Sequence, residues 1–191
     1  MTSRRFRILV GALAVAAVLS ACGAHGGQST VADQNNSGFY VRGGHVTYQV
    51  EISRQLNPYA TEDRAYLAGL PAGTSPPGAD QLWFAVFIWA KNFTTKAREA
   101  VAASDFDIVD TQGNTYYPVA LNPSLNPLAW TQMRLGPQAT EPAVDSLASD
   151  DQAQGSELLF KLNDSIYENR PLTLVLHVPG QAHPSTFSLD L

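Results

Sequence analysis

The amino-acid sequence predicts an all-β fold, an antiparallel β-sandwich of about seven or eight short strands with one short helix. Its apolar segments are short, are separated by turn-rich stretches and do not alternate with long helices. One apolar run, residues 81–92, has apolar side chains at both odd and even positions, which is typical of a strand buried on both faces. These observations favour two packed sheets with residues 81–92 as a central strand.

Residues 1–21 have the three parts of an export signal: early arginines, an apolar run over residues 8–19, and small residues. The apolar run is too short for a transmembrane helix, which needs about 18 or more apolar residues. The junction Leu19-Ser20-Ala21-Cys22 resembles the lipobox of bacterial lipoproteins, in which the cysteine thiol takes the lipid. We therefore expect Cys22 to be the lipid attachment site and the mature N-terminus. The alternative is an ordinary signal peptide with an incidental cysteine.

Cys22 is the only cysteine of the 191 residues, so the predicted fold has no disulfide and depends on its apolar core. Removal of residues 1–21 leaves nine basic against 17 acidic side chains, a formal charge of −8. This charge argues against nucleic-acid binding and against a basic surface that holds the domain on anionic lipid. The expected membrane attachment is a diacylglyceryl group on Cys22, at the extracytoplasmic face of the cell membrane.

Residues 22–44 are rich in Gly, Ser, Asn, Gln and Asp, and we expect them to form a flexible tether because they can bury little apolar surface. The sandwich domain is expected over residues 45–191. Its first strand is predicted at residues 45–54, where polar side chains alternate with Val46, Tyr48, Val50 and Ile52.

A short helix is predicted at residues 61–68, because Thr61 can cap its first turn and Gly69 ends the pattern. The central strand, residues 81–92, follows a Pro/Gly-rich loop, and its β-branched and aromatic residues favour a strand over a buried helix. The side chains that we expect to face the sandwich core are Leu82, Phe84, Val86 and Ile88. The opposite face carries Trp83, Ala85, Phe87 and Trp89.

A β-hairpin is predicted from residues 105–110 and 115–119, with Gly113 supplying a positive φ at the turn. Residues 121–138 show no strand period and are expected to form a long loop, packed down by Leu128, Trp130, Met133 and Leu135. Three final strands are predicted at residues 157–162, 171–178 and 185–191.

The succession of these segments resembles a family of exported bacterial lipoproteins over roughly residues 46–191. The features that carry the resemblance are the aromatic-rich strand ending in Lys91-Asn92, residues 106–116, the turn Leu135-Gly136-Pro137, and residues 155–160. The family has an immunoglobulin-like β-sandwich domain of unknown function, DUF4352, which is also compared with telokin-like domains. The resemblance implies an immunoglobulin-like fold and an extracytoplasmic location, and it implies no catalytic residue. The predicted helix and the long Asn-Pro loop depart from the family pattern.

No motif for nucleophilic catalysis or phosphate binding occurs in the sequence, so we expect no enzyme activity, no metal site and no cofactor. The histidines do not lie at ligand spacing, and His177 is expected to be an exposed strand residue. The first acidic group does not match an EF-hand loop; it comprises Asp105, Asp107 and Asp110 with Asn114. A second acidic group is expected in a solvated loop; its members are Asp145, Asp150, Asp151 and Glu157.

Aromatic residues form the remaining candidate site. Trp83, Phe87 and Trp89 share one face of the predicted central strand, and Trp130 lies in a segment able to cover that face. One interpretation is an open groove for a sugar, an apolar molecule or a peptide, since aromatic anchors dominate such sites. The other, which we favour, is that the helix and the loop bury this face as a second small core.

The sequence therefore predicts a lipid-anchored, non-enzymatic binding module of the bacterial cell envelope, which acts by binding another envelope component. The alternative is a carrier for a small ligand, such as a sugar, an apolar molecule or a metal ion. That carrier would use an aromatic groove around Trp83, Trp89 and Trp130.

Overall fold

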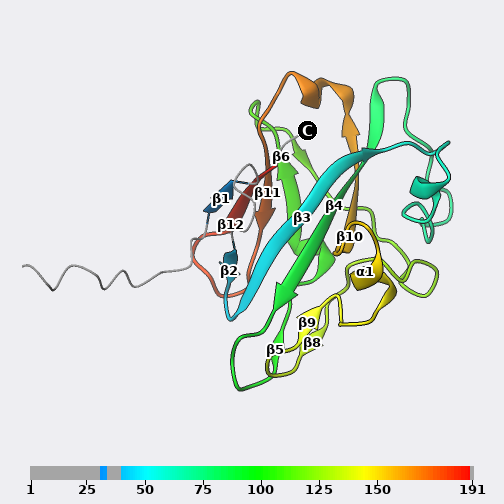
Figure 1. The fold of residues 1–191 in the computed structure, drawn as a ribbon. Helices are drawn as coiled ribbons and strands as arrows, with labels where there is room; N and C mark the ends of the chain where they lie inside the picture. The colour runs from blue at the N-terminus through cyan, green and yellow to red at the C-terminus, as the bar shows by residue number, and fades with distance from the viewer. Residues whose placement is uncertain (1–30, 34–39, 190–191) are drawn as a thin grey trace, which may run out of the picture.

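The computed structural model of the chain describes residues 31–33 and 40–189 (Figure 1). The predicted signal peptide, Cys22 and residues 34–39 of the predicted tether lie outside the described residues. The described part consists of two larger β-sheets and a third, two-stranded sheet. Within residues 31–33 and 40–189, no helix has the length and apolar character needed to cross a membrane.

The first sheet has the strand order β10, β4, β3, β2, and β9 pairs with one end of β4. Its strands are β2 (Val41–Gly43), β3 (Val46–Leu56), β4 (Gln81–Lys91), β9 (Thr140–Glu141) and β10 (Ser156–Asn163). All its pairs are antiparallel, and β4 is bonded along its length to β10 on one side and to β3 on the other. The prediction of a central strand at residues 81–92 is confirmed.

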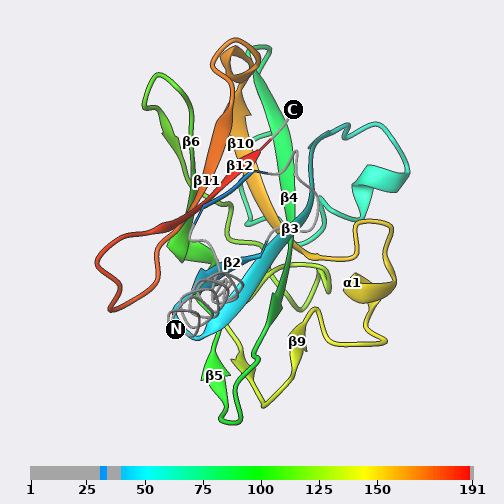
Figure 2. The same cartoon turned by 60° about the vertical axis from the view of Figure 1, so that its left-hand side comes forward.

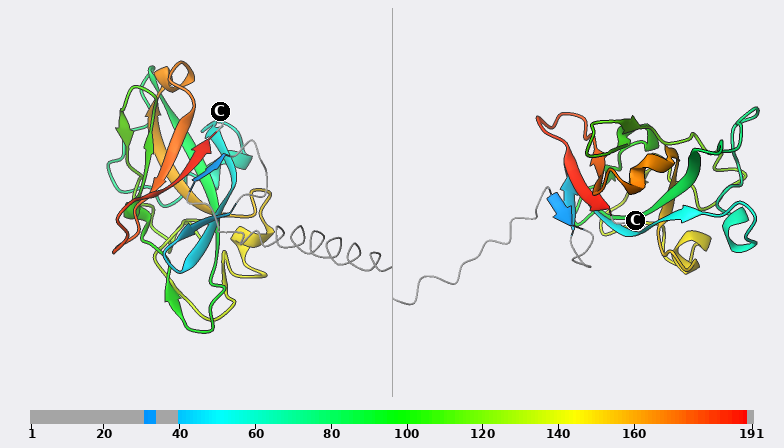
Figure 3. Two further views of the ribbon diagram at one scale, coloured as in Figure 1. Left: turned by 90° about the vertical axis from the view of Figure 1, so that its left-hand side faces the viewer. Right: turned by 90° about the horizontal axis from the view of Figure 1, so that it is seen from above.

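The second sheet has the order β1, β12, β11, β6, β7 and packs face to face with the first (Figure 3). Its strands are β1 (Val31–Asp33), β6 (Phe106–Val109), β7 (Thr115–Tyr116), β11 (Leu172–Leu176) and β12 (Ser185–Leu189). Its pairs are antiparallel except that of β1 with β12. The third sheet joins β5 (Arg98–Glu99) and β8 (Arg134–Leu135). This architecture confirms the predicted antiparallel β-sandwich.

The main core lies between the two larger sheets. Alternate residues of β4 face it as predicted, and they are Leu82, Phe84, Val86, Ile88 and Ala90. The second sheet contributes Phe106, Ile108, Leu174, Leu176 and Phe187 to the same buried cluster. Each large apolar side chain that is fully buried contributes about 1.5–3 kcal/mol relative to an exposed position, so this cluster dominates the stability of the fold.

The opposite face of β4 is also buried, in a second core around Trp83, Ala85 and Phe87. Four separate segments cover it, and their buried members are Leu56, Tyr66, Leu128, Ala148 and Ala153. Figure 2 shows the segments around residue 64 and around α1 on the side of β3 and β4 away from β6, β11 and β12. The rings of Tyr66 and Phe87 meet edge to face, with centroids 4.9 Å apart. The second small core that we favoured on sequence grounds is therefore present.

A β-bulge in β3 reverses the side-chain pattern predicted for this strand. The register shifts between Val50 and Ile52, and the residues before the shift face the main core as predicted. After it, Leu56 pairs with Trp83 and faces the second core. Because one extra residue moves every later side chain to the other face, Ile52 is 38% exposed and its predicted place in the main core is wrong.

The helix predicted at residues 61–68 is only a 3-10 turn, η1 (Glu62–Arg64), followed by further turns. Thr61 makes no side-chain cap. Asp63 is instead buried, and it accepts hydrogen bonds from Arg54 Nη2 at 2.5 Å and from the Asn57 N–H at 2.7 Å. These bonds tie the segment back to the end of β3, so tertiary contacts override the local helix signal.

The α-helix of the described residues is α1 (Leu147–Asp150), in a region that we expected to be a loop. Ser146 and Ser149 form its capping box, in which each side chain accepts a hydrogen bond from the other residue's backbone N–H. Two further 3-10 helices are η2 (Ala103–Asp105) and η3 (Asp164–Tyr167).

The sandwich begins before the predicted boundary at residue 45. Strand β2 pairs with β3, and its Val41 is buried in the main core. Strand β1 pairs in parallel with β12. Residues 31–33 and 41–43, which we had assigned to the tether, therefore belong to the two larger sheets.

The predicted hairpin and long loop are both confirmed. Strands β6 and β7 are joined by a turn in which Gly113 has a φ of 83°. The apolar residues of loop 121–138 pack down as predicted: one lies in the second core and the others in or against the main core. This loop also contains β8, whose partner is β5.

Candidate functional site

The four aromatic residues predicted to line a groove do not share one surface. Trp83 and Phe87 are 3% and 0% exposed in the second core. Trp130 is buried in the main core, on the other side of the first sheet. Of the four, Trp89 alone is not buried, and Cys22, the predicted lipidation site, lies outside the described residues.

Trp89 borders an open depression of about 390 Å³ near α1. Its indole ring lies next to the ring of Tyr40, with centroids 6.0 Å apart. The other groups around it are largely polar or acidic and include Glu51, whose pKa is raised by burial. The predicted aromatic groove is thus reduced to one half-buried tryptophan at an acidic depression.

Glu157, expected in a solvated loop, is instead 1% exposed within β10. It pairs with Phe87 of β4, which places it beneath the cover of the second core. Asn126 Nδ2 donates a hydrogen bond to its Oε2 at 3.0 Å, while Oε1 has no partner among the described residues. Burial raises the pKa of Glu157 to about 8.

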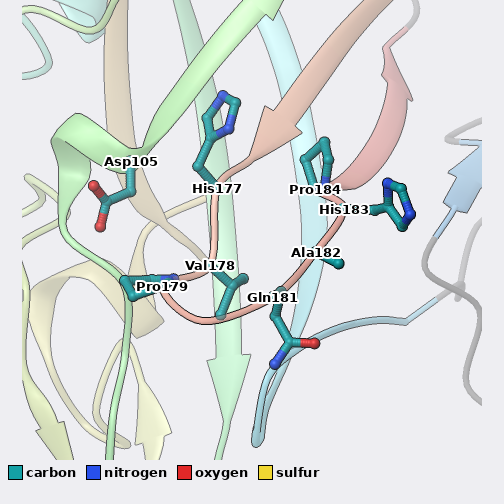
Figure 4. A pocket seen from close by; sticks show the side chains of 8 residues that line it. All are labelled: Asp105, His177, Val178, Pro179, Gln181, Ala182, His183 and Pro184. Carbon is teal, nitrogen blue, oxygen red and sulfur yellow. The ribbon is translucent and has the colours of Figure 1, made fainter.

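A second surface site lies at the end of the sandwich where three connections meet: residues 43–45, residues 98–105, and the turn 177–184 between β11 and β12 (Figure 4). Two adjoining depressions of about 330 and 310 Å³ share Asp105, Val178, Pro179 and Gln181 in their walls. We call the two depressions together the end groove. Their volumes lie at the lower end of the range of about 300–1,000 Å³ for small-molecule sites.

Two consecutive glycines shape one wall of the end groove. A Cβ at Gly43 would lie 2.6 Å from Cε2 of Tyr48, and Gly44 has a φ of 62°, which favours glycine. The tight turn between β2 and β3 therefore packs directly on the core and leaves His45 exposed at the groove.

The floor of the end groove is fixed by two buried aromatic residues. The Val101 N–H donates a hydrogen bond to Tyr48 Oη at 3.1 Å, and Trp130 Nε1–H donates to the Val101 carbonyl at 3.1 Å. Burial raises the pKa of Tyr48 to about 12, so its hydroxyl stays protonated at physiological pH. Trp130 thus positions the backbone beneath the groove and does not line a groove of its own.

Arg98 brings an unpaired positive charge to the end groove. Its Nε is buried without a hydrogen-bond partner in the part of the chain that the structure describes. The neighbouring acid, Glu99, is paired instead with Arg134 Nη1 at 2.9 Å. The guanidinium of Arg98 forms no ion pair with another described residue, so its charge is available to a ligand in the groove.

Asp105 lies in the wall that both depressions share. Its Oδ2 accepts a hydrogen bond from the Ala102 N–H at 3.1 Å, and its carbonyl accepts one from the His177 N–H at 2.8 Å. These bonds fix the backbone of η2 at the groove, while Oδ1 accepts no hydrogen bond from the described residues. The groove therefore contains a carboxylate oxygen that remains free for a ligand.

His177 lies beside the groove and is oriented by a buried acid. Its Nε2 is 2.6 Å from Oδ2 of Asp107, and its side chain is 53% exposed. The prediction of an exposed histidine is right, but the sequence did not reveal the pairing. Asp107 is 70 positions away, and the pairing of β6 with β11 brings the two together.

The end groove offers the guanidinium of Arg98, the carboxylate of Asp105 and three imidazole rings to a ligand. No hydroxyl or thiol is hydrogen-bonded to His177 among the described residues, so its pairing with Asp107 has no adjacent nucleophile there. Nor does any group of three or more His, Cys, Asp or Glu residues in the described ranges have the arrangement to hold a metal ion. The groove is thus suited to hydrogen bonds and ion pairs with a small polar ligand.

No protein-family model and no curated protein matches the chain. Among solved structures, it is similar to the yjhA protein of Bacillus subtilis, at 11% identity and a TM-score of 0.47, over 80% of this chain and 97% of that one. The B. subtilis protein ycdA, described as a "putative lipoprotein", matches at 12% identity and a TM-score of 0.47, over 79% of this chain and 38% of its own. An uncharacterized β-sandwich protein of Clostridium difficile matches at 9% identity and a TM-score of 0.40, over 79% and 89%. Similarity at this level assigns neither a family nor a function.

Proposed function

We propose that this protein is a lipid-anchored, non-enzymatic binding module of the bacterial cell envelope, of the DUF4352 type. Cys22 would hold it at the extracytoplasmic face of the cell membrane, and the end groove is its ligand site. The observation that carries the proposal is the end groove itself, in which Arg98 and Asp105 keep free hydrogen-bonding atoms. The ligand is bound and not transformed.

The position of the groove supports a binding role. In β-sandwiches, the loops gathered at one end of the sheets form variable surfaces on a rigid scaffold, and binding residues concentrate there. Here the scaffold reaches the groove directly, since Tyr48 and Trp130 hold the Val101 backbone from the main core. A site fixed in this way loses little conformational entropy when it binds its ligand.

Anchoring is supported by the junction at residues 19–22 and by the single cysteine. Cys22→Ala is expected to abolish lipid attachment and to release the protein from the membrane fraction, because the substitution removes the thiol that takes the lipid. Metabolic labelling with a radioactive fatty acid, followed by fractionation, measures both effects. Normal labelling of the variant would contradict the proposed anchor, and Ser20→Thr serves as a control that keeps the thiol.

A substitution that fills the end groove tests the ligand site. Gln181 lines both of its depressions, and Gln181→Trp is expected to remove the thermal stabilisation that a ligand gives. Val144→Trp, at the depression beside Trp89, is the matched control. A ligand at a concentration of about 100 times its Kd stabilises the folded protein by about 2.7 kcal/mol. This raises the Tm of a domain of this size by several degrees.

The panel for this test contains amino acids, sugars and short carboxylates. We expect at least one of them to raise the Tm of the wild type and of Val144→Trp, but not that of Gln181→Trp. A uniformly flat response of the wild type, or equal shifts in both variants, would count against the end groove as the ligand site.

A further inference from the structure

The depression of about 310 Å³ in the end groove has three charged side chains in its walls, Arg98, Glu99 and Asp105. Glu99 is paired with Arg134, whereas Arg98 and Asp105 carry opposite charges and form no ion pair with each other or with another described residue. We propose that this depression binds a small zwitterion, an α-amino acid or a short peptide, with its carboxylate on Arg98 and its ammonium group on Asp105. This inference rests on the proposed function and names the ligand class of the same groove.

Arg98 supplies the features that recognise a carboxylate. A guanidinium presents its N–H donors in a planar fork that matches the two oxygens of a carboxylate. No described residue forms an ion pair with Arg98, since the adjacent Glu99 is paired with Arg134 on β8. A ligand carboxylate would supply the missing negative partner.

Asp105 explains why the ligand should also carry a positive charge. Its free Oδ1 adds negative charge to the groove, and the residues that follow the predicted cleavage site have a formal charge of −8. A simple anion, and above all a dianion such as phosphate, would be repelled by this carboxylate. A zwitterion pairs with both groups and leaves no charge in the depression without a partner.

The size of the end groove agrees with this ligand class. The depression that contains Arg98 shares Val178 and Pro179 with the second one, of about 330 Å³, whose lining residues are shown in Figure 4. A free amino acid would occupy the first depression. A dipeptide would extend over the two apolar residues toward His177 and His183.

Calorimetric titration of the mature, unlipidated chain tests the inference. The probes are glycine, L-alanine and alanyl-alanine, with acetate, methylamine, inorganic phosphate and glucose for comparison. We expect L-alanine or alanyl-alanine to bind at least tenfold more tightly than acetate, methylamine or phosphate, since each of these satisfies only one of the two groups. Acetate or phosphate binding as tightly as L-alanine would overturn the inference.

Substitutions at two arginines localise the effect. Arg98→Gln is expected to weaken L-alanine binding at least tenfold. Arg64→Gln, which removes an exposed arginine of η1 that does not line the groove, is expected to change it less than twofold. Arg98→Lys keeps the positive charge but lacks the planar guanidinium. Its affinity for L-alanine is expected to lie between those of the wild type and Arg98→Gln. It replaces Arg98→Gln in the test if that variant does not fold. Unchanged affinity in the folded Arg98 variants would contradict the carboxylate contact.

The outcomes separate this inference from the proposed function. If glucose binds the wild type but not Gln181→Trp, while no zwitterion binds, the ligand class is wrong and the end groove remains a binding site. If no probe binds and none of the Tm panel shifts the wild type, both proposals fail.

Discussion

Glu157→Gln is expected to remove most of the dependence of stability on pH between about pH 4.5 and pH 8. In the folded protein the pKa of Glu157 is raised from the ordinary 4.5 to about 8, mainly because the side chain is buried. A carboxyl whose pKa is higher in the folded state contributes its full stabilisation below its pKa in the unfolded state. It loses that contribution as the pH rises through its pKa in the folded state. The wild-type free energy of unfolding should therefore fall across this window, by on the order of 4 kcal/mol.

The surroundings of Glu157 explain why the charged form is disfavoured. Asn126 Nδ2 donates the one hydrogen bond to its carboxyl from the described residues, and Oε1 has none. The charge of Asp151 raises the pKa further, while Asn126 and the charge of Arg54 lower it. Glutamine keeps the shape and accepts the bond from Asn126 without a titratable proton, so the variant should be more stable than the wild type near pH 8. A smaller dependence on pH should remain, because burial also raises the pKa of Glu51 and of Glu141.

Urea denaturation of both proteins at several pH values measures this difference. Glu168→Gln, at an exposed position, is the control and should reproduce the slope of the wild type. If the free energy of unfolding changes with pH in the same way for the wild type and for Glu157→Gln, the Glu157 carboxyl is not held protonated in the folded state.

Phe87→Ala is expected to destabilise the protein by about 3–5 kcal/mol, as much as Phe84→Ala in the main core. Both phenylalanines are fully buried, on opposite faces of β4. Alanine at position 87 would leave a cavity beneath Tyr66, whose ring lies 4.9 Å from that of Phe87. The equal cost follows because the second face of β4 is a packed core and not an open groove.

Chemical denaturation at a fixed pH measures both effects, with Tyr59→Ala as the control. Tyr59 is 85% exposed, so its loss should change stability by less than about 0.5 kcal/mol. A cost below about 1 kcal/mol for Phe87→Ala, with the expected cost for Phe84→Ala, would mean that the cover over this face is loose in solution.

The sequence predicted the elements whose pattern is long enough to show a period. Strand β4 shows apolar residues at both parities over eleven residues, and this alone identified the central strand and its two faces. The hairpin was predicted from the chemistry of one turn, with Gly113 at positive φ. The five strands that were not predicted have two or three residues each, which is too short for any period to appear.

Other features depend on contacts between distant residues and were not predictable. The bulge in β3 is a property of its pairing with β4, so Ile52 was assigned to the wrong face. Thr61 gives a helix signal that the bonds of Asp63 to Arg54 and Asn57 override. Glu157 resembles any acid in a polar stretch until its pairing with Phe87 places it beneath a cover.

The candidate site was predicted least well. The four aromatic residues were candidates for a ligand groove because they are large and few. Three of the four are buried, where they stabilise the fold. The end groove is assembled from three connections that are far apart in the sequence. Neither Arg98 in a polar stretch nor Asp105 before a strand carries a local signal, since what distinguishes them is that neither forms an ion pair with another described residue.

The most direct test of the binding role is an NMR titration of the isotope-labelled mature chain with L-alanine and alanyl-alanine. If the end groove binds these ligands, we expect the shifted backbone amide signals to belong to residues 43–45, 98–105 and 177–184, around the groove. Shifts confined to the depression beside Trp89, or no shift at any residue at millimolar probe, would contradict it.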